Sequence, residues 1–155
     1  MLKKSYFSLL MILTTASAWG MSTSENQIEH INNELFAIKR ALNVAKIQIK
    51  RAQVASPKLY ASVEPVLERA LARSEVLTQL QTTVNTHFEA IANRNMSFNS
   101  VKTTFHFSTF FPKVTMKDYG KNLFSSMAQK QYCLLLGQKL TQKKDELKNE
   151  TVVQE

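Results

Sequence analysis

The sequence predicts an all-α fold: an antiparallel helical hairpin or bundle with coiled-coil character, an aromatic-rich irregular segment and a C-terminal helix. Three observations predict this fold. Apolar residues recur every three or four positions along most of the chain, which is the helical period. The 155 residues include only three glycines and three prolines, too few for the turns of a sandwich or barrel. Hydrophobic residues make up 44% and charged residues 21%, a composition typical of one globular domain.

Residues 1–18 have the three-part pattern of a secretory signal peptide. Lys3 and Lys4 precede an apolar run over residues 6–13, and the small residues Ala16 and Ala18 fit a signal peptidase. The apolar run is shorter than the roughly 20 residues that a membrane-spanning helix needs. We therefore expect cleavage after Ala18 and a periplasmic or secreted mature protein, exported by a bacterial pathway. The alternative is an uncleaved anchor or a buried N-terminal helix.

Residues 24–55 give the clearest helical pattern. Ser24 and Gln27 resemble a capping box at the start of this helix. Pro57 ends the helix, because the residue before a proline avoids the helical conformation. A second, weaker apolar stripe favours a bundle, which buries a wider face than a two-stranded rod does. The main stripe is Ile28, Ile31, Leu35, Ile38, Leu42, Ala45, Ile49 and Ala52, and the second is Ala37, Ala41, Val44 and Ile47.

A second helix is expected over residues 63–92, after a connector at residues 58–65. Ser62 would cap it, and Pro65 would lie in its first turn, where a proline loses no internal hydrogen bond. The short connector predicts that the first two helices form an antiparallel hairpin. Arg73 falls at one inward position. The apolar face is Val63, Val66, Ala70, Leu77, Leu80, Val84 and Ile91, widened by Leu67, Leu71 and Phe88.

Residues 93–117 interrupt the helical pattern with asparagines and five phenylalanines. The alternation at residues 103–107 favours a strand, whereas Phe98, Val101 and Phe105 fit a helical turn, so both conformations stay open for residues 97–111. A turn is expected at residues 118–120. The last helix should span residues 122–149, and residues 151–155 should form a disordered tail. The inward face of this last helix is formed by Leu123, Phe124, Met127 and Leu134, next to an apolar run at residues 133–136.

Positive charge is concentrated in the second half of the chain. From Arg94 to Lys144 there are nine basic residues and one acid, Asp118, interleaved with the phenylalanines. Such a surface suits an acidic protein or an anionic envelope component, and export argues against nucleic acid. The alternative is that the lysines solvate a bundle whose end the phenylalanines fill. The candidate partner-binding residues are Lys113, Lys117, Lys121, Phe110 and Phe111.

No motif for catalysis, a cofactor or a metal stands out. His30 has the spacing of a helical metal site with Glu34 or Asn33, but such pairs are common in helices rich in glutamate. Met127 and His87 could in principle bind haem between facing helices, although residues of these types usually pack. The single cysteine, Cys133, lies in an apolar run and should be an inert thiol with a raised pKa.

These observations predict an exported, non-enzymatic helical binding protein, which acts as an envelope adaptor, a chaperone or an accessory subunit of a secretion or surface machine. A protein partner would lie in a helical groove between Leu35 or Leu42 and Leu77 or Val84. Two alternatives stay open: a bundle that carries a metal or haem, and a secreted virulence-type factor. No cofactor is expected, and a homo-oligomer is possible because an apolar stripe serves packing within or between chains.

Overall fold

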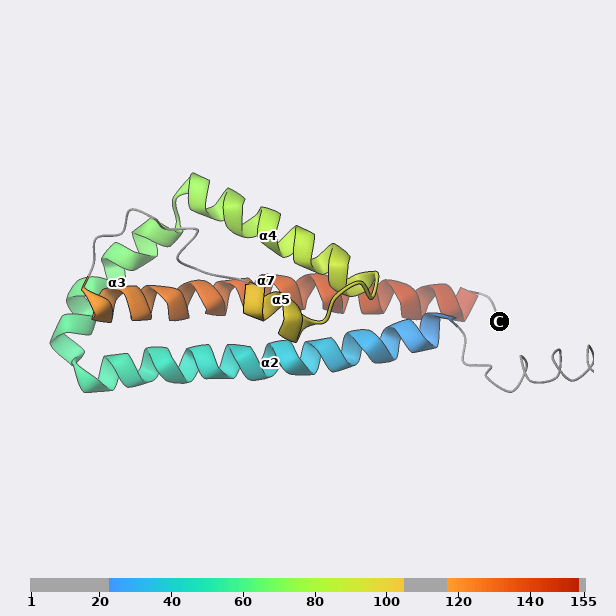
Figure 1. Cartoon of the computed structure of the whole chain (residues 1–155), viewed down its shortest axis with the longest axis horizontal. Coiled ribbons are helices and arrows are strands. Elements are labelled where there is room, and N and C mark those ends of the chain that lie inside the picture. The colour runs from blue at the N-terminus through green and yellow to red at the C-terminus, as the bar shows by residue number, and fades with distance from the viewer. Residues whose placement is uncertain (1–22, 105–116, 154–155) are drawn as a thin grey trace, which may run out of the picture.

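The computed structural model describes residues 23–104 and 117–153 (Figure 1). These residues are 92% helical and contain no strand, so the predicted all-α helical bundle is confirmed. The predicted signal peptide and most of the phenylalanine-rich segment lie outside the described residues. The described helices are α2 (Thr23–Ala55), α3 (Pro57–Leu71), α4 (Ser74–Ala92), α5 (Phe98–Thr104) and α7 (Asp118–Val153).

The two longest helices, α2 and α7, lie side by side and run in opposite directions, forming the body of a rod (Figure 1). At the end where α2 stops, α3 turns the chain upward, and α4 then returns along α7. The short helix α5 packs against α2 and α4. The main partner of α2 is therefore α7, whereas the sequence predicted a hairpin between α2 and the helix that follows it.

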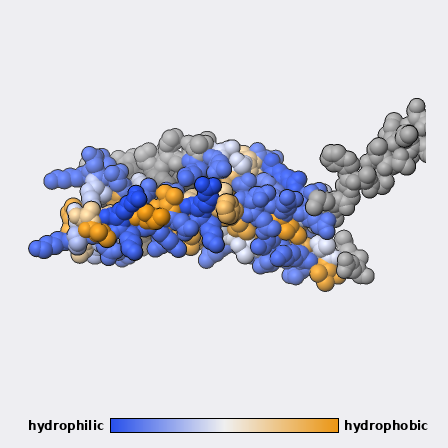
Figure 2. Space-filling view, turned by 90° about the horizontal axis from the view of Figure 1, so that it is seen from below, coloured by the Kyte–Doolittle hydropathy of each residue, from blue (hydrophilic) through white to orange (hydrophobic). Residues whose placement is uncertain are grey.

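The main apolar stripe predicted for α2 faces the interior. All eight of its residues are buried or half-buried, with Ile31 and Ala45 fully buried. The second stripe divides in two: Ala37 and Ala41 pack against the core, but Val44 and Ile47 are about half exposed. Figure 2, which looks onto α2, shows separate apolar patches along this face among polar surface. The helix therefore buries one side and keeps apolar side chains on the other.

The predicted second helix is wrong in its boundaries, because the chain forms two helices there. Residues 58–65 are not a connector: Ser56 is the N-cap of α3, and Pro57 occupies its first turn. Pro65 lies inside α3 rather than near a helix start. The break falls at Ala72 and Arg73, and Arg73 is exposed instead of facing inward.

The described part of the phenylalanine-rich region is helical, which settles the open alternative for residues 98–104. Phe98 and Val101 are fully buried on the inner face of α5. The last helix is longer than predicted, because the expected turn at residues 118–120 is its first turn and the helix continues to Val153. Leu134, predicted to face inward, is 41% exposed.

The core forms two clusters along the rod. The larger cluster joins α2, α4, α5 and α7, and its fully buried residues on α7 are Cys133, Leu136 and Leu140. The smaller cluster lies at the end where α3 crosses α7, and is built from Tyr60, Leu67, Leu71, Leu123, Phe124 and Ala128. Because α4 covers only part of the pair formed by α2 and α7, one side of that pair has no other described helix packed against it.

Candidate functional site

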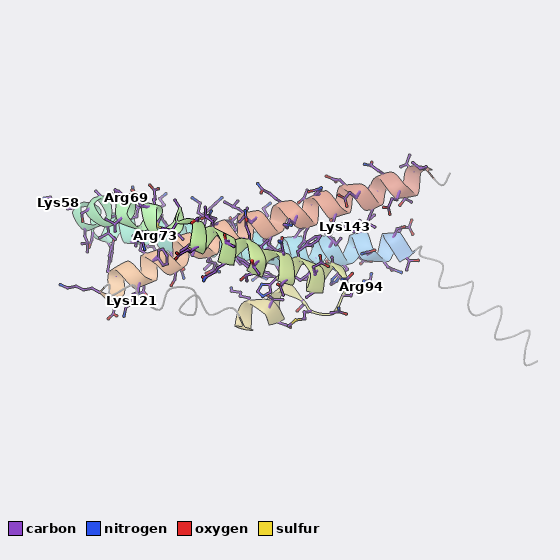
Figure 3. All side chains as sticks on the ribbon, turned by 90° about the horizontal axis from the view of Figure 1, so that it is seen from above. Lys58, Arg69, Arg73, Arg94, Lys121 and Lys143 are labelled. Atoms are coloured by element: carbon purple, nitrogen blue, oxygen red, sulfur yellow. The ribbon has the colours of Figure 1, made fainter. Side chains whose placement is uncertain are left out.

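Two of the predicted partner-binding residues, Lys117 and Lys121, are exposed at the start of α7. The other three, Lys113, Phe110 and Phe111, lie outside the described residues. The Tyr119 hydroxyl donates a hydrogen bond of 3.1 Å to the Ala52 carbonyl, which places the start of α7 beside the end of α2. Figure 3 shows Lys58 and Lys121 at this same end of the rod, together with Arg69 and Arg73. One end of the molecule therefore carries cations from α3, from α7 and from the break between α3 and α4.

A groove of about 800 Å³ lies between α2 and α7. Its apolar part includes Leu35, Leu42 and Leu134, and its rim carries polar and charged side chains. No residue of α3, α4 or α5 lines it, so the groove opens on the uncovered side of the rod. Its α7 wall extends from Cys133 to Asn149, about 24 Å at about 1.5 Å per residue.

The groove that the sequence predicted between Leu35 or Leu42 and Leu77 or Val84 does not form. Leu35 and Leu42 face α7, Val84 is fully buried, and Leu77 lines a different cavity. The residues of α7 that complete the observed groove were not predicted. Besides the apolar run at residues 133–136, a signal for them was Gly137, a glycine in the middle of a helix, which lies against Ile38 of α2.

Gly137 gives a direct test of the groove's geometry. A Cβ atom at this position would lie 3.7 Å from Cγ2 of Ile38, an ordinary van der Waals distance. Because alanine favours a helix over glycine by about 1 kcal/mol, we expect Gly137→Ala to raise the free energy of unfolding by about 0.5–1 kcal/mol. Urea unfolding followed by circular dichroism measures this change, and a loss of stability would mean that α2 and α7 pack more closely than described.

A second cavity of about 540 Å³ lies between α3, α4 and α7. Tyr60, Glu64 and Glu68 line it beside apolar residues such as Leu71 and Leu77. The Tyr60 hydroxyl donates a hydrogen bond of 2.7 Å to Oε1 of Glu64. Burial and this hydrogen bond raise the pKa of Tyr60 to about 12. The cavity's tyrosine and one of its carboxylates therefore already bind each other.

His30 and Glu34 have ligand spacing, but in the structure they join helices. Nε2 of His30 lies 2.9 Å from the Ile91 carbonyl at the end of α4. The buried carboxylate of Glu34 accepts a hydrogen bond of 2.6 Å from the Phe98 backbone N–H at the start of α5. Over the ranges 23–104 and 117–153, no three histidine, cysteine or acidic side chains gather as a metal site would require.

The proposed haem pair, Met127 and His87, belongs to two different parts of the core. Met127 packs against the smaller cluster, whereas Nδ1 of His87 shares a hydrogen bond of 2.6 Å with the Tyr132 hydroxyl in the larger one. Burial lowers the pKa of the His87 imidazole below its ordinary value of 6.5. Cys133 is buried as predicted, and burial raises the pKa of its thiol to about 11.

The lowered pKa of His87 predicts a loss of stability in mild acid. The unfolded chain binds a proton at His87 near pH 6.5, while the folded chain resists it, so stability falls as the pH drops below about 6.5. We expect wild type to lose more stability than His87→Gln between about pH 7 and pH 5. Tyr132→Phe should keep the pH dependence, because burial of the His87 imidazole, and not its hydrogen bond to Tyr132, lowers the pKa of His87. Equal pH dependence in wild type and His87→Gln would contradict the assignment.

No protein-family model matches this chain, and neither a curated protein nor a solved structure matches it. The class that the fold and the site define is an all-α helical bundle with an apolar groove along its two longest helices. The features of this chain that indicate a function are therefore the groove and the distribution of charge.

Proposed function

We infer that this chain is an exported, non-enzymatic binding protein that holds a helix of a protein partner in the groove between α2 and α7. It would act as an envelope adaptor, a chaperone or an accessory subunit of a secretion or surface machine. The observation that carries the proposal is the groove itself, which is open, about 24 Å long and apolar around Leu35, Leu42 and Leu134. The pattern of residues 1–18 supports export.

The groove has the form that helix-binding proteins use. The apolar part of the groove, around Leu35, Leu42 and Leu134, would receive the apolar stripe of an amphipathic helix. The polar side chains of α7 from Gln138 to Asn149 would border the rest of a helix of about 16 residues. Lys39 on one rim and Asp145 and Glu146 on the other could pair with charges beside the apolar stripe of the partner. The partner's helix, packed against α2 and α7 on this side, would complete a bundle, because α4 already covers the opposite side of the pair.

A pair of substitutions at Gly137 separates loss of the groove from loss of the fold. Gly137→Leu places a bulky side chain in the groove, whereas Gly137→Ala adds one methyl group and leaves the groove open. Both substitutions favour the helix over glycine. We therefore expect both variants to fold and only Gly137→Leu to lose the partner.

The partner can be detected in the cells that make the protein, with a photo-crosslinking amino acid at Gln138 on the groove wall. The matched control places the same amino acid at Thr82, which is exposed on α4 outside the groove. We expect a discrete adduct from Gln138, mapped by mass spectrometry to an amphipathic helical segment of one protein, and its loss in Gly137→Leu. Adducts that are equal at both positions, or unchanged by Gly137→Leu, would refute the proposed groove.

A further inference from the structure

The outer face of α2 carries an apolar ridge. Phe36, Ile47 and Val54 are 64%, 51% and 71% exposed, and they follow one another after about three and about two helical turns. Side chains separated by whole turns share one side of a helix. The buried residues of α2, among them Ile38 and Ala45, lie on the opposite side, facing α7 and the core. The ridge therefore points directly away from the molecule (Figure 2).

Cations flank this ridge on both sides. At about 100° per residue, Lys39, Lys46 and Lys50 lie on one flank, and Arg40 and Arg51 lie on the other. All five are exposed, and the guanidinium of Arg40 lies 6.0 Å from the centre of the Phe36 ring. The sequence has no acidic residue from 35 to 63. Among the described residues, no carboxylate forms an ion pair with these five cations.

The internal structure of the bundle does not explain these charges. Cations stabilise the end of a helix only within about the last turn, and α2 has no basic residue in its last turn. A second copy of the chain would also fit poorly where two ridges overlap, because an antiparallel pair centred on residues 36–54 would place cations opposite cations. The face is complementary to a surface that is apolar inside and negatively charged outside.

We propose that α2 lies flat on an anionic lipid bilayer, with its apolar ridge in the headgroup region and its cations among the lipid phosphates. This arrangement is that of an interfacial amphipathic helix, which combines burial of apolar side chains with attraction to anionic lipids. Lys58 follows the end of α2 at the start of α3, and it lies with Lys121 at the same end of the rod (Figure 3). No helix in the described ranges is long and apolar enough to span a membrane.

Co-sedimentation with vesicles tests the charge. We expect the purified chain to bind phosphatidylcholine vesicles that contain phosphatidylglycerol, and not vesicles of phosphatidylcholine alone. Lys46→Glu with Lys50→Glu should weaken binding more than about tenfold, because each cation near an anionic membrane contributes about a factor of five. The matched control, Lys144→Glu with Lys148→Glu on α7, changes the net charge equally and should bind nearly as wild type does.

Tryptophan fluorescence tests the ridge. Ile47→Trp should show a blue-shifted emission when anionic vesicles are added, whereas Gln79→Trp on the exposed side of α4 should not. Ile47→Ser with Val54→Ser should weaken binding about tenfold or more at unchanged charge. Absence of binding at low salt, equal loss in both charge variants, or binding without a blue shift at position 47 would overturn the proposal. Concentration-dependent dimers that Ile47→Ser abolishes would assign the ridge to a second copy instead.

Discussion

Leu136→Ala should lower the free energy of unfolding by about 2–5 kcal/mol. Leu136 is 0% exposed and belongs to the larger core cluster, where α7 meets α2 and α4. Its removal loses the transfer free energy of the buried methyl groups and leaves a cavity that long, rigid helices fill poorly. Since a domain of this size is stable by about 5–15 kcal/mol, this one substitution removes a large part of the total.

The control for this prediction lies two residues earlier on the same helix. Leu134 is 41% exposed at the groove, so Leu134→Ala should change stability by less than about 1 kcal/mol. Urea unfolding measures both variants, and the dependence on urea should keep the wild-type slope, which shows that the extent of unfolding is unchanged. Similar losses at the two positions would mean that α7 is rotated about its axis relative to the described packing.

The sequence predicts α2 well because its signal is local. Eight apolar residues at helical spacing place its inner face, and the predicted range of 24–55 differs from the observed helix by one residue. The same periodicity says nothing about which helix covers that face. The pairing of α2 with α7 joins residues far apart in the chain, and it depends on contacts such as that between Gly137 and Ile38.

The predicted helix boundaries are wrong at Pro65 and Gly120, because the helices around these two residues tolerate a proline and a glycine. Pro65 removes the hydrogen bond that the Ala61 carbonyl would accept, but both residues are exposed, so water can replace it. The turn expected at residues 118–120 is helical because Asp118 suits the start of a helix and Tyr119 hydrogen-bonds to Ala52. The preference of Asp118 for the start of a helix is visible in the sequence, whereas the hydrogen bond from Tyr119 to Ala52 is a long-range contact.

The surfaces proposed for binding were only partly predictable. The sequence indicated a basic surface with apolar side chains, and Lys117 and Lys121 are indeed exposed cations. The sequence placed that surface only in the second half of the chain, where lysines are interleaved with phenylalanines. Only one residue of the ridge on α2, Ile47, belonged to the second apolar stripe. Other members of that stripe, such as Ala41, are buried, so the stripe did not indicate an exposed face.

Glu34→Ala should lower the free energy of unfolding by about 2 kcal/mol. Glu34 is 8% exposed, and its carboxylate accepts a hydrogen bond of 2.6 Å from the backbone N–H of Phe98. Phe98 begins α5 and is itself fully buried, so the substitution leaves a backbone donor without its partner where water has little access. The loss should fall first on α5, the shortest described helix, which packs mainly on α2 and α4.

Hydrogen exchange distinguishes this local effect from a general loss of stability. In Glu34→Ala, the amide protons of residues 98–101 should exchange about 30-fold faster, while amides of α7 around Leu140 change less. Glu34→Gln is the matched control, because its amide oxygen can still accept from the Phe98 N–H, and it should lose less than half as much stability. If Glu34→Gln were as damaging as Glu34→Ala, the negative charge of Glu34 rather than its hydrogen bond would hold α5 in place.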